Sequence, residues 1–97
     1  MIHLLLVASV MTHAQVAQAI ETAPAPVRAF IQRRQGCNHW SGEEAYDQDR
    51  AKEIAAALRQ LRCREIEADG TALRRRYVRQ PEILDLLTRT VDWGEED

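Results

Sequence analysis

The feature that most constrains this chain is its pair of cysteines, Cys37 and Cys63, because two cysteines allow a single disulfide. Such a bond would close a loop of about 27 residues, which the chain-entropy model assigns about 3.5 kcal/mol of stabilisation. A chain of 97 residues is near the size at which apolar burial only just exceeds conformational entropy. The bond would therefore supply a large share of the stability of so small a domain.

The amino-terminal sequence indicates the compartment in which these cysteines are found. Leu4–Met11 reads LLLVASVM, the length of a signal-peptide core, and AQA at residues 17–19 has the small-x-small form of a cleavage site. We predict a signal peptide over residues 1–19, cleavage after Ala19, and a periplasmic or secreted location. The run is too short for a stable membrane span, which needs about 20 apolar residues. In an exported chain this small, an even cysteine count indicates a disulfide.

Two alternatives to this amino-terminal prediction stay open. The opening tripeptide MIH contains no lysine or arginine, although a signal peptide usually begins with a positive charge. The apolar run would then be a buried helix, or the true start of the protein would lie upstream.

The rest of the chain predicts an all-α fold, a small bundle of about four short helices with one disulfide. Residues 20–26, which contain Pro24 and Pro26, predict an extended linker, because proline disfavours helix in the residue before it. Residues 27–92 predict a single helical domain. Its first helix begins at Pro26 or Val27 and ends at Gly36, a residue typical of helix ends.

The second helix is the most regular of the predicted elements. Ser41 and Glu44 form an S-x-x-E capping box, and Asp47 and Asp49 are competing N-caps. The residues that follow are strong helix formers. Their apolar positions recur at spacings of four and three: Ile54, Leu58 and Leu61.

Beyond Cys63 the apolar positions move to a different helical face, which predicts a break between Arg62 and Gly70. The new face comprises Ile66, Leu73 and Tyr77. The third helix should have Asp69 as its N-cap, and a fourth should begin at Pro81, since proline suits the first helical position. The inward stripe of that helix would comprise Ile83 or Leu84, Leu87 and Val91. Residues 93–97 form an acidic tail that should fray.

The stretch CNHWSGEEAYD at residues 37–47 raises the question of chemistry. Cys37, His39 and Glu43 are the residues that a small thiol- or metal-dependent enzyme would use. A metal site would draw on the two cysteines and His39, with Glu43 or Glu44 as fourth ligand, but the close cysteine spacing typical of zinc sites is absent. We therefore interpret the stretch as structural, with no catalytic residue, metal or cofactor.

Charge is unevenly distributed along the chain. The segment Arg59–Arg79 holds seven arginines and three acids, a local charge of +4, whereas Gly42–Glu53 has a local charge of −3. RRRYVR at residues 74–79 resembles a phosphate-binding patch, but complementarity within the chain or with a protein partner explains the pattern without nucleic acid. Trp, Tyr and Arg dominate interface hot spots. The predicted contact residues are accordingly Trp40, Tyr46, Arg74, Arg75 and Arg76.

The sequence CNHWSGEEAYDQDRAKEIAAALRQLRC, followed by ADGTALRRRY, resembles small exported bacterial proteins that share a CNHWxGEExYD block and an LRC ending. The resemblance covers about residues 36–77 and implies a helical envelope domain with paired cysteines. More distantly, Cys63, Asp69, Leu73 and Tyr77 look like a helix of periplasmic lysozyme-inhibitor-like domains, with one extra residue between the aspartate and the leucine.

These observations together predict a non-enzymatic, exported helical accessory domain that binds another envelope protein. A narrower form of this hypothesis is that the domain acts like an inhibitor. The alternative is the small metal- or thiol-dependent enzyme that uses Cys37, His39 and Glu43.

Overall fold

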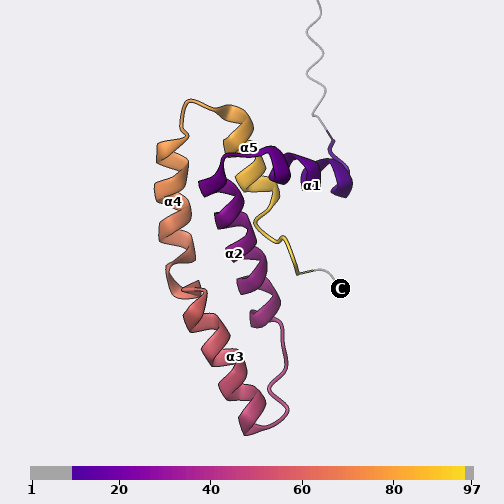
Figure 1. The fold of residues 1–97 in the computed structure, drawn as a ribbon, viewed down its shortest axis with the longest axis vertical. Coiled ribbons are helices and arrows are strands. Elements are labelled where there is room, and N and C mark those ends of the chain that lie inside the picture. The colour runs from indigo at the N-terminus through magenta and orange to yellow at the C-terminus, as the bar shows by residue number, and fades with distance from the viewer. Residues whose placement is uncertain (1–9, 96–97) are drawn as a thin grey trace, which may run out of the picture.

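The computed structural model describes residues 10–95, and every regular element in that range is a helix (Figure 1). The elements are α1 (His13–Thr22), α2 (Ala25–Ser41), α3 (Gln48–Gln60), the 3-10 helix η1 (Cys63–Glu65), α4 (Ile66–Arg76) and α5 (Pro81–Arg89). The predicted all-α class and the disulfide are confirmed. Residues 10–95 contain five α-helices rather than about four, because the amino-terminal segment adds one.

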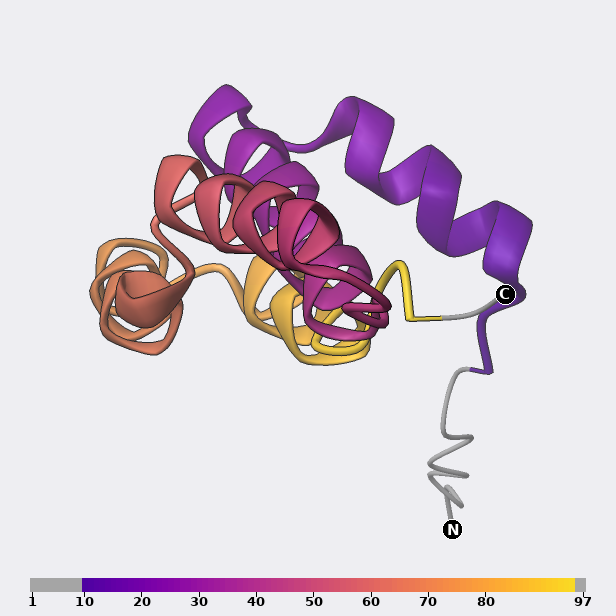
Figure 2. The same ribbon diagram turned by 90° about the horizontal axis from the view of Figure 1, so that it is seen from below.

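The other helices are arranged around α2. The helices α1, α4 and α5 surround its amino-terminal half, and α3 runs antiparallel beside its carboxyl-terminal half (Figures 1 and 2). The core lies where α1, α2 and α5 meet. It comprises Val16, Ile20, Ala23, Val27, Ile31, Tyr77, Ile83, Leu86 and Leu87. The antiparallel pair of α2 and α3, with the loop of residues 42–47, therefore extends beyond the core; we call it the hairpin.

The helix α1 occupies a segment that the sequence assigns to a leader and a linker. Thr12 and Gln15 form a reciprocal capping box that starts it, and Val16 and Ile20, one helical turn apart, are both buried in the core. The expected extended linker over residues 20–26 is wrong, because only Ala23 and Pro24 separate α1 from α2. The helical unit thus begins well before residue 27. Cleavage after Ala19 stays a prediction, and residues 1–9 of the leader lie outside the described residues.

A chain that begins at Ile20 should be less stable than one that begins at Val10 by about 2 kcal/mol, because it loses the buried Val16 and most of α1. Urea unfolding of the two chains measures the difference. The control is Gln18→Ala in the longer chain, an exposed position at which a change should stay within about 0.5 kcal/mol. Equal stability of the two chains would show that residues 10–19 contribute nothing to the fold and behave as a removable leader.

The helix α2 does not end at Gly36, as the sequence predicts, but continues to Ser41. A Cβ atom on Gly36 would lie 2.9 Å from Cδ1 of Leu61. The glycine therefore lets the end of α3 pack closely against α2, and it has no role in ending the helix. As a consequence, Cys37, His39 and Trp40 are all helical residues.

Of the competing N-caps for α3, Asp47 is the one used, since its carboxylate accepts a hydrogen bond of 2.7 Å from the backbone N–H of Arg50. The capping box with Ser41 is wrong, because the Ser41 hydroxyl instead donates to the Cys37 carbonyl within α2. The helix α3 contains no fully buried residue. Its apolar stripe, Ile54 and Leu58 with Leu61 at the C-cap, is only half-buried.

The break after α3 lies at Leu61–Glu65, where Arg62 adopts a left-handed conformation with φ of 53°. The helix α4 begins at Ile66, so Asp69 lies in its first turn and is not the N-cap. The predicted change of apolar face is confirmed, since Ile66 and Tyr77 are buried and Leu73 packs against the core.

The start of α5 at Pro81 is confirmed, and Ile83, Leu86 and Leu87 are buried. Val91 was expected to face inward but is 47% exposed, because the helix ends at Arg89. The tail does not fray at Trp93, which packs against the core and stacks on the His13 ring at 4.5 Å. Residues 96 and 97 lie outside the described residues.

Candidate functional site

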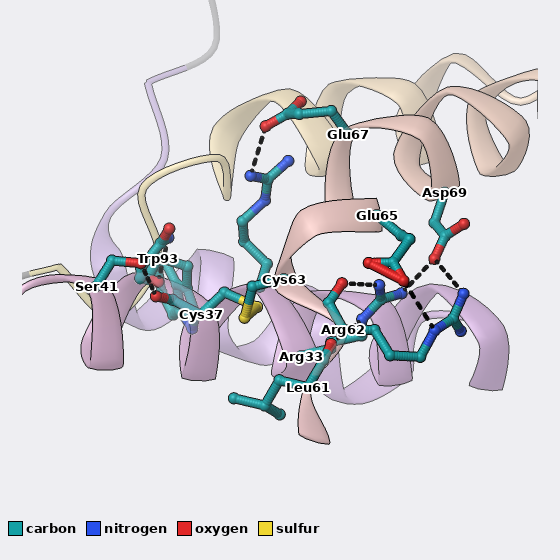
Figure 3. Close-up of a disulfide and its surroundings, with 12 residues drawn as sticks. Arg33, Cys37, Ser41, Leu61, Arg62, Cys63, Glu65, Glu67, Asp69 and Trp93 are labelled. Atoms are coloured by element: carbon teal, nitrogen blue, oxygen red, sulfur yellow. Dashed lines mark hydrogen bonds and ion pairs between the residues drawn. A yellow bond between two sulfur atoms is a disulfide. The ribbon is translucent and has the colours of Figure 1, made fainter. Parts of the chain in front are cut away.

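Cys37 and Cys63 form a disulfide, as the sequence predicts, with their Cα atoms 5.6 Å apart. It joins the carboxyl-terminal half of α2 to η1 (Figure 3). Cys37 is only 4% exposed, whereas Cys63 is half-buried. The bond therefore closes the base of the hairpin, at the point where the chain turns from α3 into α4.

Arg33 holds the same junction by hydrogen bonds (Figure 3). Its Nε donates to the Leu61 carbonyl at 2.6 Å, and one terminal nitrogen donates to the Arg62 carbonyl at 2.7 Å. The other terminal nitrogen lies 2.8 Å from the Asp69 carboxylate. The Leu61 carbonyl has no partner within α3, because the helix ends there, whereas the Arg62 carbonyl also accepts from the backbone N–H of Glu65 at 3.1 Å. The guanidinium thus caps the negative end of α3 and stabilises the turn at Arg62.

Arg34 ties α2 to α4 in a similar way, with its guanidinium 2.9 Å from the Glu67 carboxylate. The hydrogen bond and then the charge of Arg34 lower the pKa of Glu67. A lowered carboxyl pKa stabilises the fold above the ordinary Glu value, and this contribution is lost as the pH falls. Because Glu67 is largely exposed, the effect is small.

Most of the unusual 37–47 stretch serves to fix the far end of the hairpin, with Arg50 at its centre. The Arg50 guanidinium donates to the carboxylates of Glu43 and Glu53. It also lies 5.2 Å from the Trp40 ring centroid and 6.0 Å from that of Tyr46. The hydrogen bond to Glu53 is the main reason why the pKa of Arg50 is raised. We call this group the tip cluster.

Asn38 has a structural role as well, because it anchors the carboxyl-terminal segment to α2. Its side-chain amide donates to the carbonyls of Val91, at 3.0 Å, and Trp93, at 2.8 Å. The residue after Trp93, Gly94, has φ of +87° and lies against Gln35. Each of the residues Cys37, Asn38, Trp40 and Glu43 therefore has a structural partner.

The residues of the alternative enzyme do not converge in this structure. Both thiols are consumed by the disulfide. His39 is two residues from Cys37 on the same helix, so the two side chains point to nearly opposite sides, and the His39 side chain is 55% exposed. Its Nε2 lies 4.0 Å from the Glu43 carboxylate. Within residues 10–95, no three His, Cys, Asp or Glu side chains are grouped as metal ligands would be.

The predicted contact residues separate into two groups. Tyr46 is 78% exposed at the tip, whereas Trp40 is half-buried beneath Arg50. On α4, Arg75 and Arg76 are exposed, but Arg74 is half-buried and donates to the Leu84 carbonyl at 3.3 Å. Arg74 is therefore a structural residue that joins α4 to α5.

The basic and acidic segments do not neutralise each other. In residues 10–95, no ion pair joins Gly42–Glu53 to Arg59–Arg79. Of the acids in the first segment, Glu43 and Glu53 pair with Arg50 or His39. The acids of the second segment pair with Arg62 or with the arginines of α2. Four exposed arginines in the described range make no ion pair, no side-chain hydrogen bond and no contact with an aromatic ring. We call them the unpaired arginines: Arg59, Arg64, Arg75 and Arg79.

Comparison of this chain with protein-family models, with curated proteins and with solved structures found no match. None of the helices in residues 10–95 combines the length and apolar character that a membrane crossing requires.

Proposed function

We propose that this protein is a non-enzymatic, exported accessory domain that binds an acidic surface of another envelope protein. The observation that supports it best is the set of unpaired arginines on α3, on η1, on α4 and in the turn after α4, all of which are exposed in the folded chain. Complementary charge accelerates and orients protein association, and arginine is enriched at interfaces.

The disulfide supports the exported location, because such bonds persist in oxidising compartments such as the periplasm and are rare in the cytosol. The side chains best suited to catalysis already have structural partners. Cys37 is in the disulfide, and Glu43 is in an ion pair with Arg50. What is left for recognition is charge and an exposed aromatic residue, Tyr46. The inhibitor-like version of this function, implied by the likeness of Cys63–Tyr77, stays a prediction.

The proposal is tested by capture from envelope extract with the disulfide-intact protein as bait, followed by binding measurements on the captured protein. We expect a partner of net negative charge whose affinity falls as salt is raised. The double variant Arg75→Glu with Arg79→Glu should weaken binding at least tenfold, because it lowers the net charge of the exposed end of α4 and of the turn that follows it by four.

The matched control is Lys52→Glu, an exposed substitution of the same type on α3, outside the set of unpaired arginines; it should change the affinity by less than about twofold. A captured protein that binds the wild type and the double variant equally would contradict the proposal, as would the recovery of nucleic acid as the only salt-sensitive ligand.

A further inference from the structure

A groove at the base of the hairpin combines an apolar floor with three arginines. It lies between the end of α3 and η1, beside the disulfide, and encloses about 750 Å³. Ala55 and Leu58 of α3 provide the floor, and Arg59, Arg62 and Arg64 stand around it. A space of this size is typical of a site that accepts a small ligand or a short peptide segment.

The floor is open because α3 packs on one side only. None of its residues is fully buried, and Leu58 is half-buried although it belongs to the apolar stripe of the helix. An apolar side chain from outside could therefore cover the exposed part of Leu58 and gain the free energy of removing both surfaces from water.

The charge of the groove is positive, with three arginines and a single acid, Glu65. Arg62 is already near two carboxylates, 3.8 Å from Glu65 and 3.5 Å from Asp69. Arg59 and Arg64 belong to the unpaired arginines and are free to bind an anion. The negative end of α3 offsets them little, because the Arg33 guanidinium binds the carbonyls of Leu61 and Arg62 directly after the helix.

We propose that this groove binds an acidic peptide segment of the partner protein, with one aliphatic side chain on Leu58 and flanking carboxylates on Arg59 and Arg64. Arginine pairs with carboxylates in a fork-like geometry that favours two hydrogen bonds. The apolar floor favours a peptide over a nucleic acid, whose backbone would place phosphates where Leu58 offers no donor. This inference rests on the proposed function and specifies the site and the chemistry of the partner.

Fluorescence anisotropy with a labelled acetyl-EELEE-amide peptide tests the groove, at about 0.15 M salt so that distant charges are screened. We expect saturable binding, at least tenfold weaker binding of acetyl-EEGEE-amide, which lacks the aliphatic side chain, and none of acetyl-KKLKK-amide. Arg59→Glu should weaken binding of EELEE at least tenfold, and Arg64→Gln provides a second variant. Circular dichroism confirms that both variants fold.

The control is Lys52→Glu, which makes the same charge change on the same helix, two turns from Arg59 and outside the groove. It should alter binding by less than about twofold. The inference would be overturned if EELEE and EEGEE bound equally, or if Lys52→Glu weakened binding as much as Arg59→Glu does. It would also be overturned if the protein preferred a single-stranded oligonucleotide, or if it self-associated in a way that blocks the groove.

The outcome is separable from that of the proposed function. If the peptide fails to bind while a captured acidic protein still depends on Arg75 and Arg79, the groove is wrong and the binding function stands. If no acidic partner binds at all, the proposed function fails whatever the peptide does.

Discussion

Loss of the Cys37–Cys63 disulfide should lower the free energy of unfolding by about 3.5 kcal/mol, the largest effect expected of any change to this chain. The bond closes a loop with a sequence separation of 26 residues, so its absence restores conformational freedom mainly to the unfolded chain. Without the bond, α3 should also be held less firmly against α2 in the folded protein, because α3 has no fully buried residue.

Urea unfolding of the oxidised protein and of the double variant Cys37→Ser with Cys63→Ser measures this effect. Dithiothreitol should destabilise the wild type by a similar amount and leave the double variant unchanged, which serves as the control. Equal stability of the oxidised and reduced protein would contradict a structural role for the bond.

Arg33→Ala should lower the free energy of unfolding by about 2–3 kcal/mol. The substitution removes hydrogen bonds from a charged donor to the Leu61 and Arg62 carbonyls, and such bonds contribute about 1.5–3 kcal/mol. It also leaves the carboxylate of Asp69 without its shortest ion pair, at 2.8 Å. The left-handed turn at Arg62 would lose the contact that stabilises it.

Arg33→Lys separates charge from geometry, because lysine retains the positive charge but lacks the planar fork that reaches both carbonyls. It should recover less than half of the loss. Arg75→Ala, an exposed position on α4, is the control and should change stability by less than about 0.5 kcal/mol. If Arg33→Ala behaves like Arg75→Ala in urea unfolding, the cap of α3 is not a stabilising contact.

The elements that sequence could predict are those whose signals are local. Pro81 as a first helical residue depends on a few neighbouring residues and is as expected, and Asp47 is one of the competing N-caps that such local signals indicated. The change of apolar face after Cys63 is also a local pattern, and it located the break to within a few residues.

The elements that sequence missed depend on contacts between distant segments. Gly36 is a typical helix end, and only the approach of Leu61, 25 positions later, explains why the helix continues through it. Trp93 belonged to a tail that was expected to fray, but it stacks on His13, near the opposite end of the chain. The amino-terminal segment was predicted to be a leader, with a buried helix as the alternative, and only its contacts with distant helices place Val16 in the core.

The candidate site was predicted in part. Residue type correctly indicated that arginine-rich segments would be exposed, as Arg75 and Arg76 are, but it could not tell that Arg74 binds the Leu84 carbonyl. The groove arginines were counted in the charge of Arg59–Arg79 but not chosen as contacts. These arginines converge because Arg62 adopts a left-handed conformation. Non-glycine residues rarely adopt this conformation, so the sequence pattern gave no sign of it.

The central claim is that the two cysteines form a structural bond and belong to no reactive or metal-binding site. The most direct measurement is mass spectrometry of a tryptic digest, made without reductant on protein purified from the cell envelope. Our account predicts that the peptides Gln35–Arg50 and Cys63–Arg64 appear as one linked species that separates on reduction. Recovery of the two peptides separately, each with an alkylated thiol, would contradict it, and so would stoichiometric zinc in the intact protein.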